Sequence, residues 1–352
     1  MGVLAIVGTD RAAFLYRSDN ARRSWRIEGP LFKGWKVTAT ARLASGRWLA
    51  ATASEVYGPA LHVSDDLADW RQIDKGPAWS KDGDRKLNQI WRIVPAGERI
   101  YVGVDEAGLF RSDDGGETWV GLDGLNEHAT RSAWYPGAGG LCAHAVVVDP
   151  GNPDRIWCGI SAVGVFRSDD GGGTWHPKNQ GVKVVIEDKT HKEIGFCVHG
   201  LVGDPDDPDT LYRREHTGVF RSRDAGETWK RTEEGLPSRF GFPIAMDRST
   251  KDLFVVPLES DEYRIPVDAK LRVYRSRDGA DSWEPLSRGL PQEHAYMGVL
   301  RSALDVDHLD PCGVYIGTTS GSVFVSNDAG DSWRELPGTL PRVLCISVHV
   351  DS

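Results

Sequence analysis

One short pattern, Ser-x-Asp-x-Gly-x-Thr/Ser-Trp, recurs along the whole chain and constrains its fold more than any other feature. Seven copies of this box are present, four complete and three altered: residues 18–25, 64–70, 112–119, 168–175, 222–229, 276–283 and 326–333. The sixth copy has Ala280 at the Gly position, and the first two copies depart further from the pattern. Such a repeat predicts a fold assembled from similar modules.

The spacing of the boxes predicts what each module is. The tryptophans that close the boxes are 45, 49, 56, 54, 54 and 50 residues apart: Trp25, Trp70, Trp119, Trp175, Trp229, Trp283 and Trp333. About 50 residues is the length of one four-stranded propeller blade. The unit ending at Trp175 contains four strand-like runs: residues 145–148, 155–160, 164–167 and 174–176. The sequence therefore predicts an all-β, seven-bladed β-propeller.

The two ends of the chain predict how the propeller closes. Residues 4–8 and 13–17 match the second and third strands of a module, and no first strand precedes them. Residues 343–348 form a spare strand at the other end. Pairing this strand with the N-terminal strands would complete the first blade and cover its exposed edge. Because no box spacing exceeds 56 residues, residues 1–352 are expected to form a single propeller domain.

The residue types of the box explain its recurrence as a turn. An Asp carboxylate accepts hydrogen bonds from turn amides, Gly adopts a positive φ angle, and Trp anchors the outgoing strand. The box is therefore predicted to stabilise the fold and to carry no chemistry itself.

Charge and cysteine content limit the partners and the compartment. Lys and Arg number 42 against 51 Asp and Glu, so the net charge is 42 − 51 = −9, with the acidic residues spread along the chain. Nucleic acid and anionic membranes require clustered cations, so neither is an expected partner. Five Cys, no apolar run of 18 residues and no signal-like N-terminus favour a reduced, cytoplasmic protein.

Four segments carry a resemblance to a known family: residues 108–119, 139–144, 241–245 and 273–279. With its boxes, the chain resembles the BNR or Asp-box proteins, the repeat family of bacterial sialidases, and in particular sialidase-like bacterial proteins of about this length. The resemblance implies the propeller fold. It implies less about function, because the same turn occurs in sialidases, xyloglucan-degrading enzymes, photosystem assembly factors and sorting receptors.

The sialidase pattern fits only in part. Sialidases resemble one another in having six blades and a Phe/Tyr-Arg-Ile-Pro motif ahead of the first box. Here the motif occupies residues 263–266, between the fifth and sixth boxes. The displacement favours a loop role for Arg264, and the chain is predicted not to be a true sialidase.

Long loops rich in functional groups are expected on one face of the propeller, at the mouth of its central channel. Aligning the blades on their turns makes His144 and His199 equivalent, with Gln89 at the same place in the third blade. Aligning them on Gly-Val-Phe makes His216 equivalent to Glu106. The sequence thus predicts that polar groups from three consecutive blades converge on one mouth.

Catalytic roles are predicted for four residues of this set: Glu106, His144, His199 and His216. Substrate binding is predicted for Gln89 and for four residues of the loop before His144: His128, Arg131, Trp134 and Tyr135. His144, His199 and His216 could also hold a divalent transition metal (Zn²⁺, Cu²⁺ or Fe²⁺), since neutral imidazoles with a carboxylate suit these ions. Two alternatives stay open: a metal-free site built from the same residues, and histidines that only bridge neighbouring blades.

Three functions are compatible with these residues. The first is a hydrolase or lyase acting on a small polar or sugar-like ligand at the channel mouth. The second is a non-catalytic module that binds a ligand or a protein. The third is glycan recognition without cleavage, with aromatic stacking faces at Trp35, Trp79, Trp134 and Tyr296.

Overall fold

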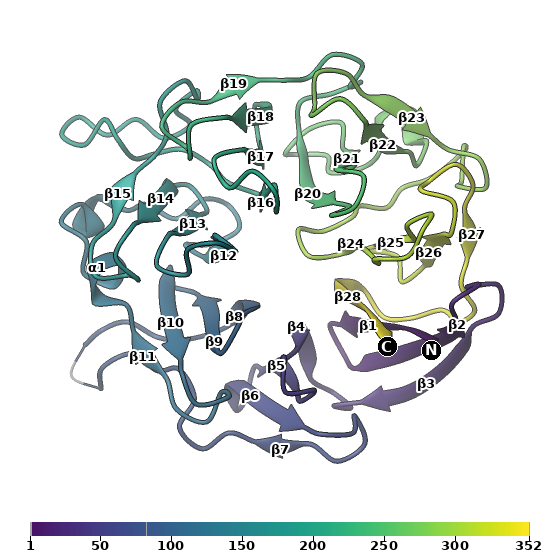
Figure 1. The fold of residues 1–352 in the computed structure, drawn as a ribbon, viewed down its shortest axis with the longest axis horizontal. Coiled ribbons are helices and arrows are strands. Elements are labelled where there is room, and N and C mark those ends of the chain that lie inside the picture. Colours follow the sequence, from purple (N-terminus) through teal and green to yellow (C-terminus); the bar gives the residue numbers. More distant parts are fainter. Residues whose placement is uncertain (1, 82, 352) are drawn as a thin grey trace. The chain divides into compact units, whose positions relative to one another are not determined.

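The computed structural model describes residues 2–81 and 83–351, and this part of the chain forms seven four-stranded sheets. The first sheet contains β28 (Val343–Asp351), β1 (Gly2–Thr9), β2 (Ala13–Asp19) and β3 (Arg26–Leu31) in hydrogen-bonding order. The second contains β4 (Lys36–Arg42), β5 (Trp48–Ser54), β6 (Gly58–Ser64) and β7 (Arg71–Gln72). The third contains β8 (Ile90–Ala96), β9 (Arg99–Val104), β10 (Gly108–Ser112) and β11 (Val120–Gly121). Figure 1 labels these strands along the chain.

The remaining four sheets repeat this order. The fourth contains β12 (Ala143–Val148), β13 (Ile156–Ile160), β14 (Gly164–Ser168) and β15 (His176–Pro177), and the fifth contains β16 (Gly200–Gly203), β17 (Leu211–Glu215), β18 (Gly218–Ser222) and β19 (Lys230–Arg231). The sixth contains β20 (Gly241–Met246), β21 (Leu253–Pro257), β22 (Val273–Ser276) and β23 (Glu284–Leu286). The seventh contains β24 (Leu304–Val306), β25 (Val314–Gly317), β26 (Val323–Ser326) and β27 (Arg334–Glu335). The predicted fold class, a seven-bladed β-propeller, is confirmed.

Helical structure is confined to short turns in the described ranges: α1 (Asp123–Asn126) and the 3₁₀ turns η1 (Arg131–Ala133) and η2 (Val267–Ala269). None of the described helices is long or apolar enough to cross a bilayer.

The predicted closure of the first blade is confirmed. β28 pairs antiparallel with β1 over its whole length, from Gly2 opposite Asp351 to Thr9 opposite Val343. β1 in turn pairs with β2, so the last strand of the chain completes a sheet begun by the first. Because Val3 to Thr9 are all buried, β28 covers a strand edge that would otherwise be apolar and open.

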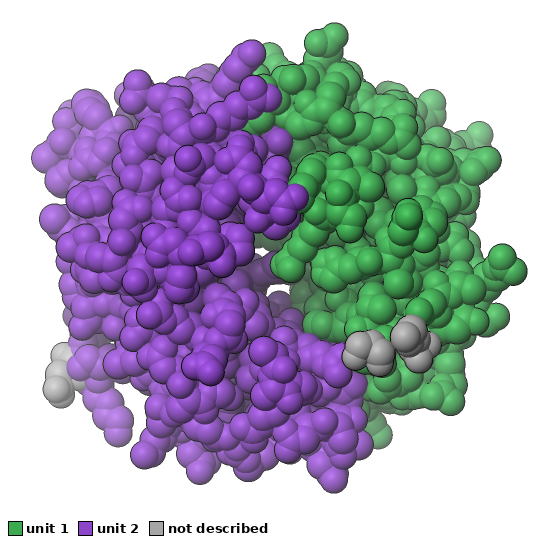
Figure 2. Space-filling view, in the orientation of Figure 1, with its two compact units in different colours: residues 1–37, 213–221, 231–352 green, residues 38–212, 222–230 purple. Residues whose placement is uncertain are grey.

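Contacts within the structure group the chain into two compact units, shown in different colours in Figure 2. Unit 1 comprises residues 1–37, 213–221 and 231–352, and unit 2 comprises residues 38–212 and 222–230. Unit 1 has a large apolar core around Phe254 and Tyr315. Unit 2 has two apolar clusters, one around Ile156 and Phe166 and one around Leu49. The single-domain organisation over residues 1–352 stays a prediction.

The box turns have the predicted hydrogen bonds. In the fourth box, Asp170 accepts the Thr174 N–H and hydroxyl at 2.8 and 2.7 Å and the Ser168 hydroxyl at 2.8 Å. Gly172 adopts φ 100°, and its carbonyl accepts the Trp175 indole N–H at 3.1 Å. These bonds hold Thr174 in the turn, so β15 begins at His176, two residues later than predicted.

These hydrogen bonds predict a sharp loss of stability in acid. The Thr174 N–H, the Thr174 hydroxyl and the Ser168 hydroxyl lower the pKa of Asp170 to about 2. Four other boxes have an Asp carboxylate whose pKa is raised by burial but lowered overall, because its hydrogen bonds have the larger effect: Asp114, Asp224, Asp278 and Asp328. A folded-state pKa below the unfolded value of about 3.9 stabilises the fold above that value, and the stabilisation disappears as the pH falls towards about 2.

We therefore expect the free energy of unfolding in urea to decline steeply between about pH 4 and pH 2. Asp170→Asn should lower stability at pH 7 and make this decline shallower, because one linked carboxylate is gone. An unchanged pH profile in Asp170→Asn would contradict the assignment.

Candidate functional site

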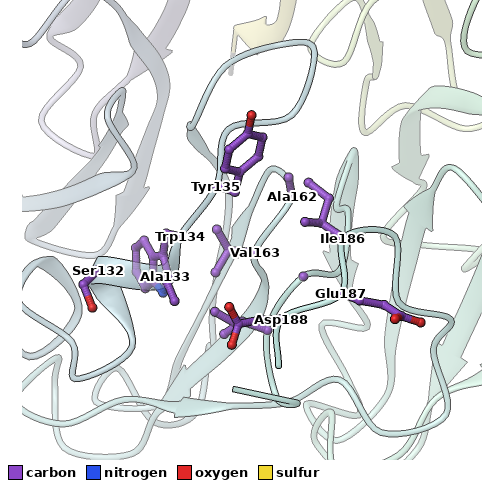
Figure 3. Close-up of a pocket in the computed structure, with 11 residues that line it drawn as sticks. Ser132, Ala133, Trp134, Tyr135, Ala162, Val163, Ile186, Glu187 and Asp188 are labelled. Carbon is purple, nitrogen blue, oxygen red and sulfur yellow. The ribbon is translucent and has the colours of Figure 1, made fainter. Parts of the chain in front are cut away.

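A pocket of about 310 Å³ lies within unit 2 (Figure 3). Its walls come from three places: the loop that follows α1, the turn between β13 and β14, and the long loop between β15 and β16. It is lined by Ser132, Ala133, Trp134, Tyr135, Ala162, Val163, Ile186, Glu187, Asp188, Ile194 and Gly195. The volume lies at the small end of the range of about 300–1,000 Å³ typical of small-molecule sites.

The aromatic wall contains two predicted substrate-binding residues. Trp134 is buried, and its indole N–H donates to the Thr130 hydroxyl at 2.9 Å. Its ring packs against Phe166, with centroids 5.4 Å apart. Tyr135 is 66% exposed and leaves its ring free for an incoming ligand. The pocket therefore offers one rigid and one accessible aromatic surface.

The acidic part of the pocket was not anticipated from the sequence. Glu187 and Asp188 lie in the loop between β15 and β16, where no repeat pattern marks them. The Asp188 carboxylate accepts N–H bonds from His191 at 2.6 Å and Thr190 at 2.8 Å. These bonds lower the pKa of Asp188, so the pocket keeps an ionised carboxylate at neutral pH.

Arg131 and His128 lie beside the pocket and support it. The Arg131 guanidinium donates to the backbone carbonyl of Ala107 at 2.8 Å and to that of Glu106. His128 Nδ1 lies 2.9 Å from the Thr130 hydroxyl, and burial lowers the pKa of the imidazole. Neither residue lines the cavity, and their predicted contacts with substrate remain untested.

Glu106 and Gln89 are half-buried and lie outside the lining of the pocket. The side chain of the neighbouring Asp105 accepts the backbone N–H groups of Asn88 and Gln89 at 2.9 and 2.7 Å. Burial raises the pKa of Asp105. The structure thus gives Gln89 a fixed backbone, and the roles predicted for the Gln89 and Glu106 side chains stay predictions.

His144 is buried in β12, and its Nε2 lies 2.9 Å from the backbone oxygen of Val198, ahead of β16. This hydrogen bond joins two consecutive blades of unit 2. The contact is the one expected of a bridging histidine, one of the alternatives left open by the sequence.

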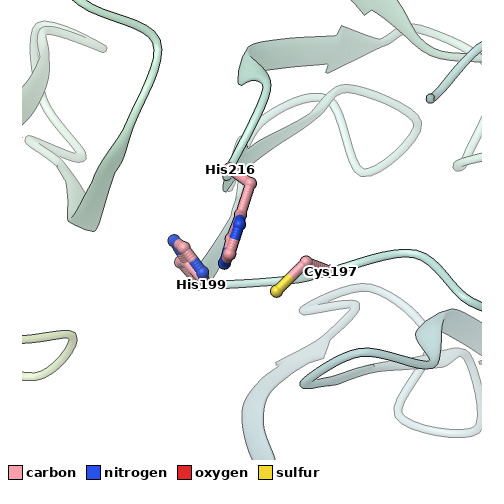
Figure 4. A group of neighbouring side chains, drawn as sticks. All are labelled: Cys197, His199 and His216. Atoms are coloured by element: carbon pink, nitrogen blue, oxygen red, sulfur yellow. The ribbon is translucent and has the colours of Figure 1, made fainter. Parts of the chain in front are cut away.

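Figure 4 draws the side chains of Cys197, His199 and His216. Cys197 and His199 both belong to unit 2, and one potential ligand atom of each lies within 4.8 Å of the other. Burial lowers the pKa of His216, with Asp261 opposing the shift. Cys197 was not part of the predicted metal-binding set. Metal binding by His144, His199 and His216 stays a prediction.

Comparison with known proteins supports the family seen in the boxes. Residues 166–177 match the family model of the BNR/Asp-box repeat. Xyloglucanase Xgh74A of Acetivibrio thermocellus is 26% identical over 322 residues, which cover 82% of this chain and 36% of the relative. The chain thus spans about a third of the length of this curated relative.

Two solved structures have a similar fold. An ancestral GH74 enzyme superposes with a TM-score of 0.55 and 16% identity, covering 85% of this chain and 38% of the other. YCF48 from Cyanidioschyzon merolae gives a TM-score of 0.54 and 13% identity, covering 86% and 85%. At such identities the likeness shows the fold alone. With seven four-stranded sheets, box turns and a repeat model that matches residues 166–177, the chain is a seven-bladed β-propeller that carries the BNR/Asp-box repeat.

Proposed function

We propose that the protein is a glycoside hydrolase that binds a saccharide in the pocket of unit 2. The observation that carries the proposal is the composition of the pocket lining, which combines the aromatic residues Trp134 and Tyr135 with two acidic residues, Glu187 and Asp188. Sugar rings stack on aromatic faces, and most glycoside hydrolases use a pair of carboxylic acids. The similarity to a protein named as a xyloglucanase supports the same class of substrate.

Asp188 is the better candidate for the ionised partner of the pair. Its carboxylate is fixed by two N–H donors and has a lowered pKa, as a base or nucleophile requires at neutral pH. Glu187 is the second carboxylate of the pocket and is assigned the acid role. Tyr135 would stack on the bound ring.

A substrate screen tests the proposal. Purified protein is incubated with xyloglucan, its oligosaccharides, cello-oligosaccharides and acidic glycans, and new reducing ends are measured. Release of reducing ends from at least one glycan is expected. Saccharide binding without cleavage would instead support the non-catalytic glycan-binding module, and neither binding nor cleavage would overturn the proposal.

Sialosides are expected to remain intact. Arg264 of the displaced motif is exposed, adopts φ 47°, and donates its Nε–H to the Asp261 carbonyl at 2.7 Å. No release above the no-enzyme rate is therefore expected from a fluorogenic sialoside. Robust release that Arg264→Ala abolishes would show that a sialidase-type site exists despite the displacement.

A further inference from the structure

The indole of Trp134, which forms one wall of the pocket, is held by a stack of alternating cations and aromatic rings. The Arg131 guanidinium carbon lies 4.8 Å from the ring centroid of Trp134 and 5.5 Å from that of Trp79. Arg85 lies over Trp79 at 4.2 Å. The stack therefore runs from the half-exposed Arg85 to the pocket wall.

The central cation of this stack is fixed by hydrogen bonds. Arg131 donates to two consecutive backbone carbonyls, those of Glu106 and Ala107, in the turn between β9 and β10. Burial lowers the pKa of Arg131 to about 10, and the nearby Arg85 adds to the shift. Arg131 is thus still charged at neutral pH, and its guanidinium contacts backbone carbonyls and aromatic rings of the protein.

Trp79 is itself locked in place. Its indole N–H donates to the Asp105 carbonyl at 3.3 Å. A Cβ atom at Gly108 would lie 2.3 Å from Cη2 of the Trp79 ring, so only glycine at position 108 admits the ring. The guanidinium of Arg131 therefore lies between two rings, those of Trp79 and Trp134.

We propose that Arg131 is a positioning residue: it fixes Trp134 as a preformed wall of the pocket. A pocket wall that is already ordered loses little entropy when a ligand binds against it, so affinity rises. The identification of the ligand as a saccharide rests on the proposed function. The positioning of Trp134 by Arg131 does not depend on the ligand, so the positioning and the ligand binding are tested separately.

The first test needs no ligand. Quenching of tryptophan fluorescence by acrylamide is measured for each protein and for the same protein carrying Trp134→Phe. The difference between the two measurements gives the contribution of Trp134. In Arg131→Met, Trp134 is expected to become more accessible to acrylamide, and Arg131→Lys should recover part of the protection. Arg85→Met is the matched control, since it removes the outer cation and leaves Arg131 in place. Unchanged quenching in Arg131→Met would overturn the positioning role.

The second test uses a xyloglucan heptasaccharide. Loss of the preformed wall is expected to raise KM about tenfold in Arg131→Met, with kcat within about twofold, as fits a lost cation–π contact. Arg85→Met should stay within about twofold of the parent. A fall in kcat with unchanged KM would contradict the role of Trp134 as a preformed binding wall.

A second variant covers the case in which Arg131→Met does not fold. Thr130→Val removes the acceptor of the Trp134 indole N–H and keeps the guanidinium. Like Arg131→Met, this variant should increase both the acrylamide quenching of Trp134 and the KM. If the parent binds no heptasaccharide, the proposed function fails, while the quenching result still decides the role of Arg131.

Discussion

Replacing Asp307 by Ala is expected to destabilise the protein by about 3–5 kcal/mol, the usual result of removing one partner of a buried ion pair. Asp307 and Arg22 have side chains that are 0% and 5% exposed, and their charged groups meet at 2.9 Å. Asp307 also accepts the Tyr315 hydroxyl at 2.9 Å and the Gly313 N–H at 2.7 Å. Without it, the guanidinium stays buried with no opposite charge beside it.

Urea unfolding of the parent and the variant measures this loss. Glu28→Gln is the matched control, because Glu28 pairs with Arg17 at 3.1 Å with both side chains about one-third exposed. An exposed pair of this kind contributes less than about 1 kcal/mol. Equal free energies of unfolding for Asp307→Ala and Glu28→Gln would show that the buried pair contributes no more to stability than the exposed pair.

Exchanging Asp188 for Asn is expected to lower the rate of glycan hydrolysis by about 10²- to 10⁴-fold, the usual contribution of a positioned acid or base. The Asn oxygen can still accept the N–H groups of Thr190 and His191, so the loop should keep its conformation. What disappears is the negative charge at the pocket.

Glu193→Gln serves as the control for Asp188→Asn. Glu193 belongs to the same loop, lies 3.3 Å from His191, and does not line the pocket. Its replacement should leave kcat and KM within about twofold of the parent. A full rate in Asp188→Asn, measured on the substrate found in the screen, would remove Asp188 from the mechanism.

The fold was predictable because its signal is local and repeated. Each box specifies its own turn through residues two to seven positions apart, and a strand follows each turn. Even Ala280, in place of the usual Gly, keeps the turn, at φ 70° and with its N–H bonded to the Ser276 hydroxyl at 2.8 Å. The altered sixth copy therefore does not hide the pattern.

The site was predictable only in part, because loops from different blades build it. Trp134 and Tyr135, which line the pocket, were singled out because they stand in the long loop just before His144. Glu187 and Asp188 were missed, because the pairing of that loop with the turn at Val163 depends on tertiary packing. The altered first box hid a similar feature: Arg22 takes the Gly position at φ 53° and reaches Asp307, far away in the sequence.

The pairing of β1 with β28 also bears on how the protein is made. On the ribosome, β1 is synthesised before the other strands of the propeller, and its partner β28 is synthesised after them. Until residues 343–351 leave the exit tunnel, the nascent chain carries an unpaired, apolar strand edge of the kind that invites aggregation. A chaperone bound during translation would cover the β1 edge. In a product truncated before Val343, that edge would remain unpaired.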